Sequence, residues 1–538
     1  MAQYLNGRVV EMLSHQEPGS AFMLLRKPSI NDSDEIYLVE YLMRKLTVFV
    51  LAPFILILLQ SFAFSQTVIK ANQLQEDFAI FKKAYTELHP GLYRYVDSRT
   101  MEQNFDDLGK ELQKDMPLDK AYLAFSRFLA KIKCGHTYCN FWNQSERVKQ
   151  EVFGRADKVP FTFSLVDKRM IVVKNASDDE RLKPGVEILS INGVSVKEIL
   201  DNLIILVRGD GSNDEKRLYD LQLAAVGEYE AFDVYFPLVY PPSDGRFKIV
   251  AVDIRTQKRF ESCLSAITRA SRLEKLESRY GKQQTSIDDL WQFKILDNQT
   301  AYLKTGSFVI WKMKLDWKAF LKNAFQEIDR RGIKNLILDI RGNEGGADEA
   351  GEVLEDYIRW KPVRIEGNQK LLRYSKVSPA IDPYLNTWDK SFRNRENQVR
   401  DAGNGFYTWK NANLEDIERG ASKKAFQGKI YLLVDAANSS ATFYLASLMK
   451  QNQLATLVGQ ATGGNRRGLN GSQMFFLILP NSKIEMDIPL IGTYPVRQQP
   501  DEGIMPDIYV KPNLEDIING VDTELEAVKR LISLEEKS

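Results

Sequence analysis

The sequence predicts an α+β protein of several domains: a helical N-terminal domain, a β-rich middle domain and an α/β C-terminal core. Near the start, apolar residues recur at three- and four-residue spacing, which is typical of amphipathic helices. Short runs rich in β-branched and aromatic residues follow, and the last part of the chain alternates strand patterns with helix patterns. With 538 residues the chain is long enough for two or three domains.

The first 65 residues contain a pattern typical of an export signal. Arg44 and Lys45 precede an apolar run, and Ala63-Phe64-Ser65 supplies small residues at the spacing that a signal peptidase reads. The run is shorter than the roughly twenty residues that a membrane span needs. We therefore predict a signal peptide over residues 43–65, a mistaken extension over residues 1–42, and a periplasmic or secreted protein with no permanent membrane anchor.

Charge and cysteine content limit the expected partners and cofactors. The 73 Lys and Arg residues nearly cancel the 72 Asp and Glu residues, so we expect no nucleic-acid partner. Of the three cysteines, Cys134 and Cys139 are close enough in sequence to pair, but sequence does not show the geometry that a disulfide requires. No second His or acidic residue stands nearby at ligand spacing, so we expect no metal and no cofactor.

Residues 66–150 are predicted to form the helical domain. One helical face has an apolar stripe of Leu74, Phe78, Phe81 and Tyr85. A second helical pattern presents Tyr122, Phe125, Phe128 and Leu129, and it ends at "KCGHTYCNF". We expect both stripes to form the core of this domain.

Residues 155–265 are predicted to form the β-rich domain. In "LKPGVEILSINGVSV" an apolar strand is closed by Asn192-Gly193, a strong turn signal. This stretch resembles the peptide-binding PDZ module, with Glu187 in place of the usual Asp, and the alternative is an unrelated β-hairpin. A PDZ-like domain would capture an extended peptide as an added strand. Residues 266–290, charged and helix-prone, are predicted to be a linker.

Residues 291–530 are predicted to form the α/β core, in which each strand ends at a turn of small residues. One such turn contains Gly345 and Gly346, and glycine lets a backbone approach a ligand closely. Another has two serines, Ser439 and Ser440, between a strand and a helix. Such serines serve either as a helix N-cap or as a nucleophile beside the free N–H groups of the helix start. Residues 386–416 are predicted to be a long surface insertion.

Four motifs follow one another in this core: "LILDIRGNEGG", "SSATFYLASLMK", "TLVGQATGGN" and "DEGIMPDIYV". Behind a helical segment and a PDZ-like module, they resemble the tail-specific proteases, serine peptidase family S41, and in particular its tricorn-like branch. That branch also includes the retinoid-binding interphotoreceptor proteins. The resemblance implies an α/β core of the ClpP/crotonase-like kind and a peptide or protein substrate.

The resemblance places the nucleophile at Ser440, in an "S-A" pair that opens a helix. Many relatives use a lysine as the base, but the corresponding position is Asn465. The tricorn-like branch uses a histidine, and His136 in "KCGHTY" matches its "G-H-[ST]" segment. An imidazole can take and return a proton near neutral pH. Of the other histidines, His15 lies in the suspected extension and His89 is expected to be structural.

The remaining site residues also follow from the resemblance. Glu502 is predicted to orient His136, with Asp501 as the reserve. The oxyanion hole is predicted at the backbone N–H of Ala441 and one from the Gly345-Gly346 turn. Some relatives have a serine before the histidine, and Gly135 stands there in this chain.

The sequence therefore predicts an exported serine endopeptidase that acylates Ser440 with His136 as general base. Two alternatives stay open: a non-catalytic carrier of lipid, retinoid or peptide, and a Ser/Lys-dyad protease with Lys483 as the nearest candidate base. Whether Arg466 and Arg467 hold a substrate carboxylate also stays open.

Overall fold

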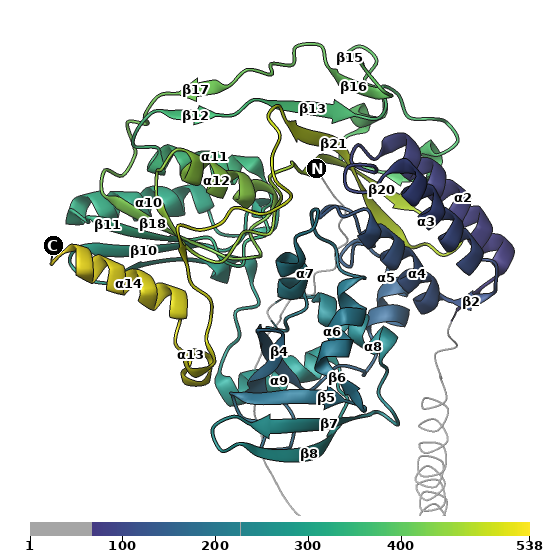
Figure 1. The fold of residues 1–538 in the computed structure, drawn as a ribbon, viewed down its shortest axis with the longest axis horizontal. Helices are drawn as coiled ribbons and strands as arrows, with labels where there is room; N and C mark the ends of the chain where they lie inside the picture. The colour runs from purple at the N-terminus through teal and green to yellow at the C-terminus, as the bar shows by residue number, and fades with distance from the viewer. Residues whose placement is uncertain (1–66, 226, 538) are drawn as a thin grey trace, which may run out of the picture. The chain divides into compact units, whose positions relative to one another are not determined.

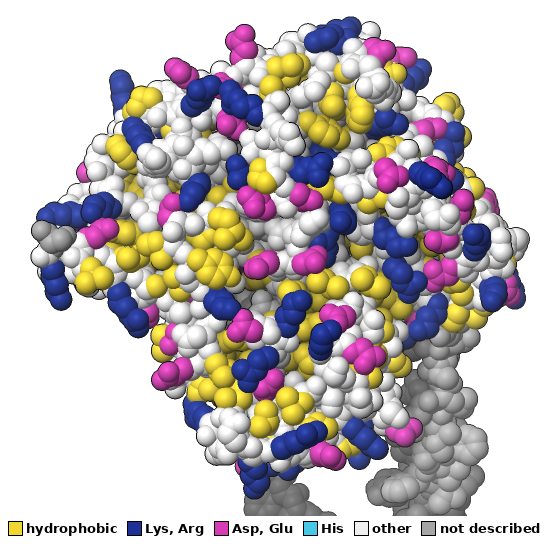
Figure 2. Space-filling model, viewed as in Figure 1, with side chains coloured by type: hydrophobic (Ala, Val, Ile, Leu, Met, Phe, Trp, Pro, Cys, Tyr) yellow, Lys and Arg dark blue, Asp and Glu magenta, His cyan; other side chains and the backbone are white. Residues whose placement is uncertain are grey.

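The computed structural model describes residues 67–225 and 227–537 (Figure 1). The predicted extension, residues 1–42, and the predicted signal peptide, residues 43–65, lie outside these ranges. Within the described ranges, none of the helices combines the length and apolar character that a membrane crossing requires. Figure 2 shows Lys and Arg side chains interspersed with Asp and Glu over the face drawn.

The helical region consists of α2 (Ala71–Leu88), α3 (Ser98–Glu111) and α4 (Leu118–Lys131), followed by the short α5 (Glu146–Val148) and a π-helical turn (Lys149–Phe153). The strands β1 (Val68–Ile69) and β2 (Met116–Pro117) pair at its edge. The predicted apolar stripes meet in its core, where the ring of Phe81 packs edge-on against those of Phe125 and Phe128. Pro90 follows the last turn of α2, and the loop after it leads to α3.

The middle region is an antiparallel sheet in the order β3-β4-β5-β7-β8, with β6 paired to β5. Its strands are β3 (Phe161–Val166), β4 (Arg169–Asn175), β5 (Val186–Ile191), β6 (Val194–Ser195), β7 (Arg246–Asp253) and β8 (Lys258–Ser265). Its helices are α6 (Val196–Ile204), α7 (Asp214–Asp220) and α8 (Ala231–Val239). The predicted hairpin after β5 is confirmed: Asn192 and Gly193 have positive φ angles of 51° and 82°, as a tight two-residue turn requires.

The prediction of a linker over residues 266–290 is wrong. These residues contain α9 (Arg269–Tyr280), whose Arg272 is fully buried against the middle region. The Arg272 guanidinium forms a bidentate pair with the buried carboxylate of Asp233 in α8. The charged composition of this segment suggests a solvated linker. Sequence alone does not show that one of these charges, Arg272, is buried and paired.

The core sheet has the order β22-β19-β18-β11-β10-β9. Its strands are β9 (Trp291–Ile295), β10 (Thr300–Thr305), β11 (Asn335–Asp339), β18 (Lys429–Val434), β19 (Thr456–Gly459) and β22 (Ile508–Tyr509). All pairs are parallel except β9 with β10. Side chains alternate between two apolar layers, with Leu336 and Leu432 facing one and Ile337 and Leu433 the other.

Helices cover both faces of this sheet (Figure 1). On one face, the apolar side chains of the sheet pack against α10 (Trp317–Arg331), α11 (Asp348–Ile358) and α12 (Ser440–Gln451). On the other face they pack against α14 (Thr523–Glu535), which follows the short α13 (Leu514–Asn519). Because the strands are parallel, their carboxyl ends share one edge, where the turns after β11 and β18 meet.

A third sheet, in the order β14-β20-β21-β13-β16-β15, joins the helical region to the core. Its strands are β13 (Asn368–Leu372), β14 (Leu385–Asn386), β15 (Val399–Gly403), β16 (Phe406–Trp409), β20 (Asn470–Ile478) and β21 (Glu485–Pro495), and β12 (Val363–Ile365) pairs separately with β17 (Ile417–Arg419). The predicted insertion, residues 386–416, therefore supplies β15 and β16. One hydrophobic cluster includes Phe81 of α2, Phe161 of β3 and Ile488 of β21.

Candidate active site

The backbone at Ser440 is strained. β18 ends at Val434, and after a short turn Ser440 begins α12 with a φ of +52°. A residue with a β-carbon adopts this left-handed conformation rarely, and the strain costs on the order of 1–3 kcal/mol. Ser439 takes the N-cap position, but its hydroxyl donates to the carbonyl of Glu344 at 3.0 Å and makes no cap hydrogen bond.

Buried hydrogen bonds hold this turn against the turn after β11. The side-chain amide of Asn438 donates to the carbonyls of Ile340 and Asn343, and the hydroxyl of Thr442 donates to the same Asn343 carbonyl at 2.8 Å. The carboxylate of Asp435 accepts from the N–H of Gly342 at 3.0 Å. The two turns therefore form one rigid support for the Ser440 side chain.

The structure brings His136 to Ser440. The Nε2 atom of His136 lies 3.1 Å from the Ser440 hydroxyl oxygen, although 304 positions separate the two residues. Burial lowers the pKa of His136, while the nearby charge of Asp210 raises it, and burial is the larger influence. The ring is therefore neutral at pH 7, which is the state in which it can accept a proton.

His89 has the structural role that its position predicts. It is fully buried, its Nε2 lies 2.8 Å from the hydroxyl of Thr137, and its Nδ1 accepts from the N–H of Gly91. Burial lowers the pKa of His89 to about 3. A neutral His89 thus anchors the residue that follows His136.

The prediction that Glu502 orients His136 is wrong. Glu502 is exposed and pairs with Arg466 at 3.2 Å. The reserve, Asp501, accepts hydrogen bonds from the N–H and hydroxyl of Ser212 and from the side chain of Asn465. Within the described ranges, the Nδ1 atom of His136 is buried and has no hydrogen-bond partner. The motif "DEGIMPDIYV" gives the positions of Asp501 and Glu502 in the chain, but it does not show the direction of their side chains.

Two residues missed by sequence reasoning, Arg208 and Asp210, enclose the residue before His136. Asp210, only 2% exposed, accepts from the N–H of Gly135 at 2.8 Å, and Arg208 donates to the Gly135 carbonyl at 3.1 Å. A β-carbon at position 135 would lie 2.6 Å from the Asp210 carboxylate, so glycine is needed there. The only sequence feature that marks Arg208 and Asp210 is the Gly-rich stretch "RGDGSN", and such a stretch is typical of an ordinary loop.

Arg208 also connects this loop to the glycine turn of the core. Its guanidinium donates to the carboxylate of Glu344 at 2.8 Å and lies over the ring of Tyr138. Lys216 approaches the same carboxylate at 3.4 Å. The loop between α6 and α7 therefore contacts both the His136 segment and the turn that faces Ser440.

The predicted oxyanion donors are only partly available. Gly345 and Gly346 have φ angles of +99° and +140°, and a β-carbon on Gly345 would lie 2.7 Å from that of Ser440. The N–H of Gly345, however, donates to the side chain of Asn343 at 2.8 Å, so this N–H is already occupied. Ala441 lies in the first turn of α12, where helical N–H groups lack a partner in the helix. Ala441 and Gly346 are therefore the remaining candidates.

Ser440 and His136 line a cavity of about 550 Å³. Its wall also includes Trp311 and Trp388, whose side chains are strongly exposed. Lys483 does not line this cavity; it lies in the turn between β20 and β21, next to Asn481, which bonds to Asp77 of α2. The alternative with Lys483 as the base thus has no geometric support.

The cysteines are all free in the structure. Cys134 and Cys139 are buried, and burial raises their pKa values to about 11 and about 12. The side chain of Asn470 donates to the Cys134 sulfur at 3.3 Å, so this thiol contributes to the packing beside His136. Among the described residues, no group of three or more His, Cys, Asp or Glu side chains could hold a metal ion.

Comparison with known families settles what kind of domain surrounds Ser440. Residues 299–510 match the family model described as peptidase family S41. This segment is an S41 peptidase domain. The chain thus contains a serine-type peptidase domain, and it is the part that includes Ser440, Ala441 and the Gly345-Gly346 turn. His136 lies outside the S41 match.

Solved structures are similar in fold to most of this chain, beyond the S41 domain alone. The structure of mature CPAF complexed with lactacystin has 14% sequence identity and a TM-score of 0.58, and the match covers 86% of this chain and 98% of that chain. Mature CPAF has 14% identity and a TM-score of 0.56, with 83% and 94% covered. At this identity the likeness describes the fold alone. A search of curated protein sequences finds no match.

Proposed function

We propose that the chain is a serine endopeptidase in which Ser440 attacks the peptide carbonyl and His136 is the general base. The observation that supports this most is the 3.1 Å contact between the His136 ring and the Ser440 hydroxyl, at a strained turn of an S41 domain. A serine hydroxyl is a weak nucleophile until a base takes its proton, and this contact is within hydrogen-bond reach.

In the proposed mechanism, Nε2 of His136 is the unprotonated nitrogen and accepts the Ser440 proton as the oxygen bonds to the carbonyl carbon. The N–H groups of Ala441 and Gly346 bind the oxygen that becomes negative. The imidazolium then gives its proton to the leaving amine, and the carbon–nitrogen bond breaks to leave an acyl ester on Ser440. Water, deprotonated by His136, then bonds to the acyl carbon; the bond from this carbon to the Ser440 oxygen breaks, the acid product leaves, and His136 returns the proton to Ser440.

Asp210 is proposed as a positioning residue. Through the N–H of Gly135 it fixes the backbone next to His136. Its negative charge also raises the pKa of His136, so it stabilises the imidazolium that forms when Ser440 loses its proton. This role replaces the one expected for Glu502.

The middle region is proposed to be the PDZ-like domain that captures an extended part of the substrate. Among the described strands its edge strand β8 pairs only with β7, which leaves one side for an added strand, while the Glu261 carbonyl of β8 already accepts from Arg181. The proposed protein is exported by the signal peptide at residues 43–65, and its substrates are peptides or proteins.

A fluorophosphonate probe, which forms a covalent bond with activated serines, tests this function. Wild type should become labelled, whereas Ser440→Ala and His136→Ala should not, because each removes one half of the nucleophile pair. Ser439→Ala and Lys483→Ala are matched controls that should keep the label. An unlabelled wild type would favour the carrier alternative, and labelling that survives His136→Ala would exclude His136 as the base.

A further inference from the structure

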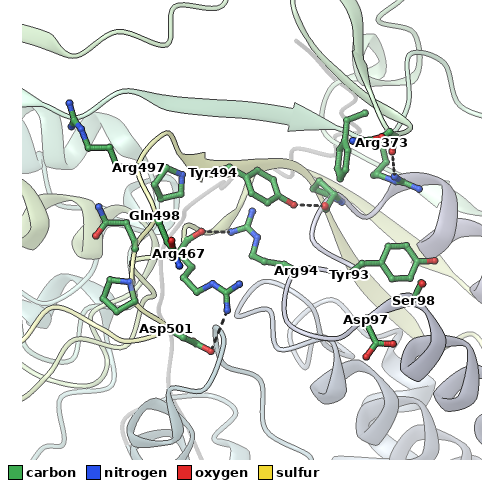
Figure 3. A pocket seen from close by; sticks show the side chains of 16 residues that line it. Tyr93, Arg94, Asp97, Ser98, Arg373, Arg467, Tyr494, Arg497, Gln498 and Asp501 are labelled. Atoms are coloured by element: carbon green, nitrogen blue, oxygen red, sulfur yellow. Dashed lines mark hydrogen bonds and ion pairs between the residues drawn. The ribbon is translucent and has the colours of Figure 1, made fainter.

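A second cavity, of about 910 Å³, adjoins the one at Ser440 (Figure 3). The two cavities share Pro495 and Gln499 in their walls. Four arginines line the second cavity: Arg94, Arg373, Arg467 and Arg497. They come from the loop after α2, from the ends of β13 and β21, and from the loop between β19 and β20. We call this space the arginine cavity.

The two carboxylates in its wall already have partners. Asp97 caps α3 and accepts from both the N–H and the hydroxyl of Thr100. Asp501 accepts from Ser212 and Asn465, and its ion pair with Arg467 is long, at 3.9 Å. The cavity therefore has more positive than negative charge to offer a ligand.

One of the arginines is fully engaged. Arg497 pairs with Glu366 at 3.4 Å and with Asp416 at 2.9 Å, and in Figure 3 its side chain points away from the others. Arg94 and Arg373 differ from it, because neither has a carboxylate within ion-pair distance in the part of the chain that the structure describes. Arg373 lies over the ring of Phe406 and donates to the Asn404 carbonyl at 3.3 Å.

Arg94 is the least satisfied of the four. Its guanidinium lies 3.9 Å from the centre of the Tyr494 ring, and its Nη1 makes only a long hydrogen bond, 3.5 Å, to the Arg467 carbonyl. Its Nε and Nη2 atoms are buried and have no hydrogen-bond partner in the described ranges. A guanidinium stays charged in proteins, so these unpaired N–H groups cost free energy until an acceptor reaches them.

The unpaired nitrogens identify the kind of acceptor. Nε and Nη2 together form the side of a guanidinium that binds both oxygens of a carboxylate, as Arg330 does with Glu327 elsewhere in this chain. A stacked arginine beside a cavity is suited to such planar recognition. Arg94 lines the cavity with its guanidinium stacked on the Tyr494 ring, so a rotation of the side chain away from that ring is needed to present both nitrogens to a ligand.

We propose that the arginine cavity binds a carboxylate of the same peptide whose scissile bond lies at Ser440, with Arg94 and Arg373 as its ligands. The shared wall at Pro495 and Gln499 gives one extended peptide a path between the two cavities. The inference rests on the proposed peptidase function. The carboxylate comes either from the C-terminus of the peptide or from an Asp or Glu side chain.

A pool of synthetic peptides of mixed sequence tests this inference, prepared once with free C-termini and once with C-terminal amides. Cleavage by wild type, Arg94→Ala, Arg373→Ala and Arg530→Ala is followed by mass spectrometry. Arg530 is an exposed residue of α14 outside both cavities, so its variant controls for the change in net charge. Fluorophosphonate labelling of each variant reports on the Ser440 site independently.

Wild type should cleave carboxylate-bearing peptides about tenfold or more faster than neutral amides. Arg94→Ala should remove this preference, Arg373→Ala should weaken it, and both should label as fast as wild type and Arg530→Ala. Preference for free termini identifies the C-terminus as the source, and preference for amides that contain Asp or Glu identifies a side chain. Labelled wild type with no carboxylate preference, or with a preference that survives Arg94→Ala, overturns this inference alone. Unlabelled wild type overturns the proposed function.

Discussion

At the scale of single residues, the Ser440 and His136 side chains are held in place by hydrogen bonds that neighbouring residues make to the backbone on either side of them. Asn438 and Thr442 hold the serine turn, while Asp210 and Arg208 hold the backbone at Gly135. A displacement of about 1 Å in such a site can reduce the rate roughly 100-fold. The supporting residues are therefore expected to affect the rate strongly even though they do not touch the substrate.

We predict that Asp210→Asn lowers kcat/KM roughly 10- to 100-fold. The charges that act on His136 are those of Asp210, Arg208, Asp348 and Glu344, and Asp210 is the one that raises the His136 pKa most. Because only neutral His136 can act as the base, the rate falls as pH drops below its pKa. Without the Asp210 charge that pKa is lower still, so the acid limb of the kcat/KM profile should move to lower pH.

The measurement is a kcat/KM profile from pH 4 to 8 for wild type and variant. Asp214→Asn, at an exposed carboxylate at the start of α7, is the matched control and should leave the profile unchanged. A loss of rate without any shift of the acid limb would mean that Asp210 acts on structure alone.

At the scale of elements, charged side chains determine how segments pack together. Arg272 fixes α9 to α8, and Asp487 of β21 accepts from the side chains of Asn140 and Asn143 in the helical region. Tyr85 of α2 donates its hydroxyl to the Asp487 carbonyl at 2.9 Å. The Arg272–Asp233 pair and the Tyr85–Asp487 hydrogen bond are buried, where the loss of one partner is costly.

Asp233→Ala is predicted to lower the free energy of unfolding by about 3–5 kcal/mol, because it leaves the Arg272 charge buried without a partner. Urea unfolding measures the effect. Asp178→Ala provides the comparison. It breaks the exposed pair between Asp178 and Lys275, which lies in α9 like Arg272, and it should cost less than about 1 kcal/mol. Equal effects of the two substitutions would contradict the importance of the buried pair.

Asp487→Asn is predicted to stabilise the protein at pH 8. Burial raises the pKa of Asp487 to about 7, so the folded protein keeps this proton up to about pH 7 while the unfolded chain loses it near pH 4. The contribution of Asp487 to stability therefore decreases as pH rises from about 4 to 7. Asn cannot ionise, so the variant should lose less stability between pH 5 and pH 8.

Urea unfolding midpoints at pH 5 and pH 8 test this expectation. Asp106→Asn, at an exposed position of α3, is the control. If the variant and wild type lose the same stability over this interval, Asp487 is not protonated in the folded protein at pH 5.

At the scale of the whole molecule, three sheets and the helical region are needed to bring together residues from distant parts of the chain. His136 follows α4, Asp210 lies between α6 and α7, and Ser440 begins α12. The hydrophobic cluster that joins the helical region, the middle region and β20–β21 holds the first two in place. The S41 match begins at residue 299, so the proposed base lies outside the matched segment.

Export is a prediction at the same scale. A chain that starts at Met43 should be found in the periplasm of a Gram-negative host with its N-terminus close to Gln66, because residues 43–65 have the pattern of a cleaved signal. N-terminal sequencing of the purified protein measures this. A version with Leu51→Arg and Leu58→Arg, which interrupts the apolar run, is the control and should stay in the cytoplasm. A mature protein that retains residues 43–65 would contradict the prediction.

The sequence by itself determined the helical stripes, the Asn192-Gly193 hairpin, the alternation of strands and helices in the core, and the serine turn, because each depends on local spacing and on turn chemistry. The sequence also identified His136 as the candidate base, since the chain has only three histidines and "KCGHTY" matches the "G-H-[ST]" segment of the tricorn-like branch. Only the tertiary structure shows that Asp210 bonds the backbone beside His136 while Glu502 pairs with Arg466, and that residues 266–290 pack instead of linking. It alone also shows that Nε and Nη2 of Arg94 have no hydrogen-bond partner among the described residues. The physical reason is that a charged side chain finds its partner through the packing of distant segments, and local sequence does not contain that information.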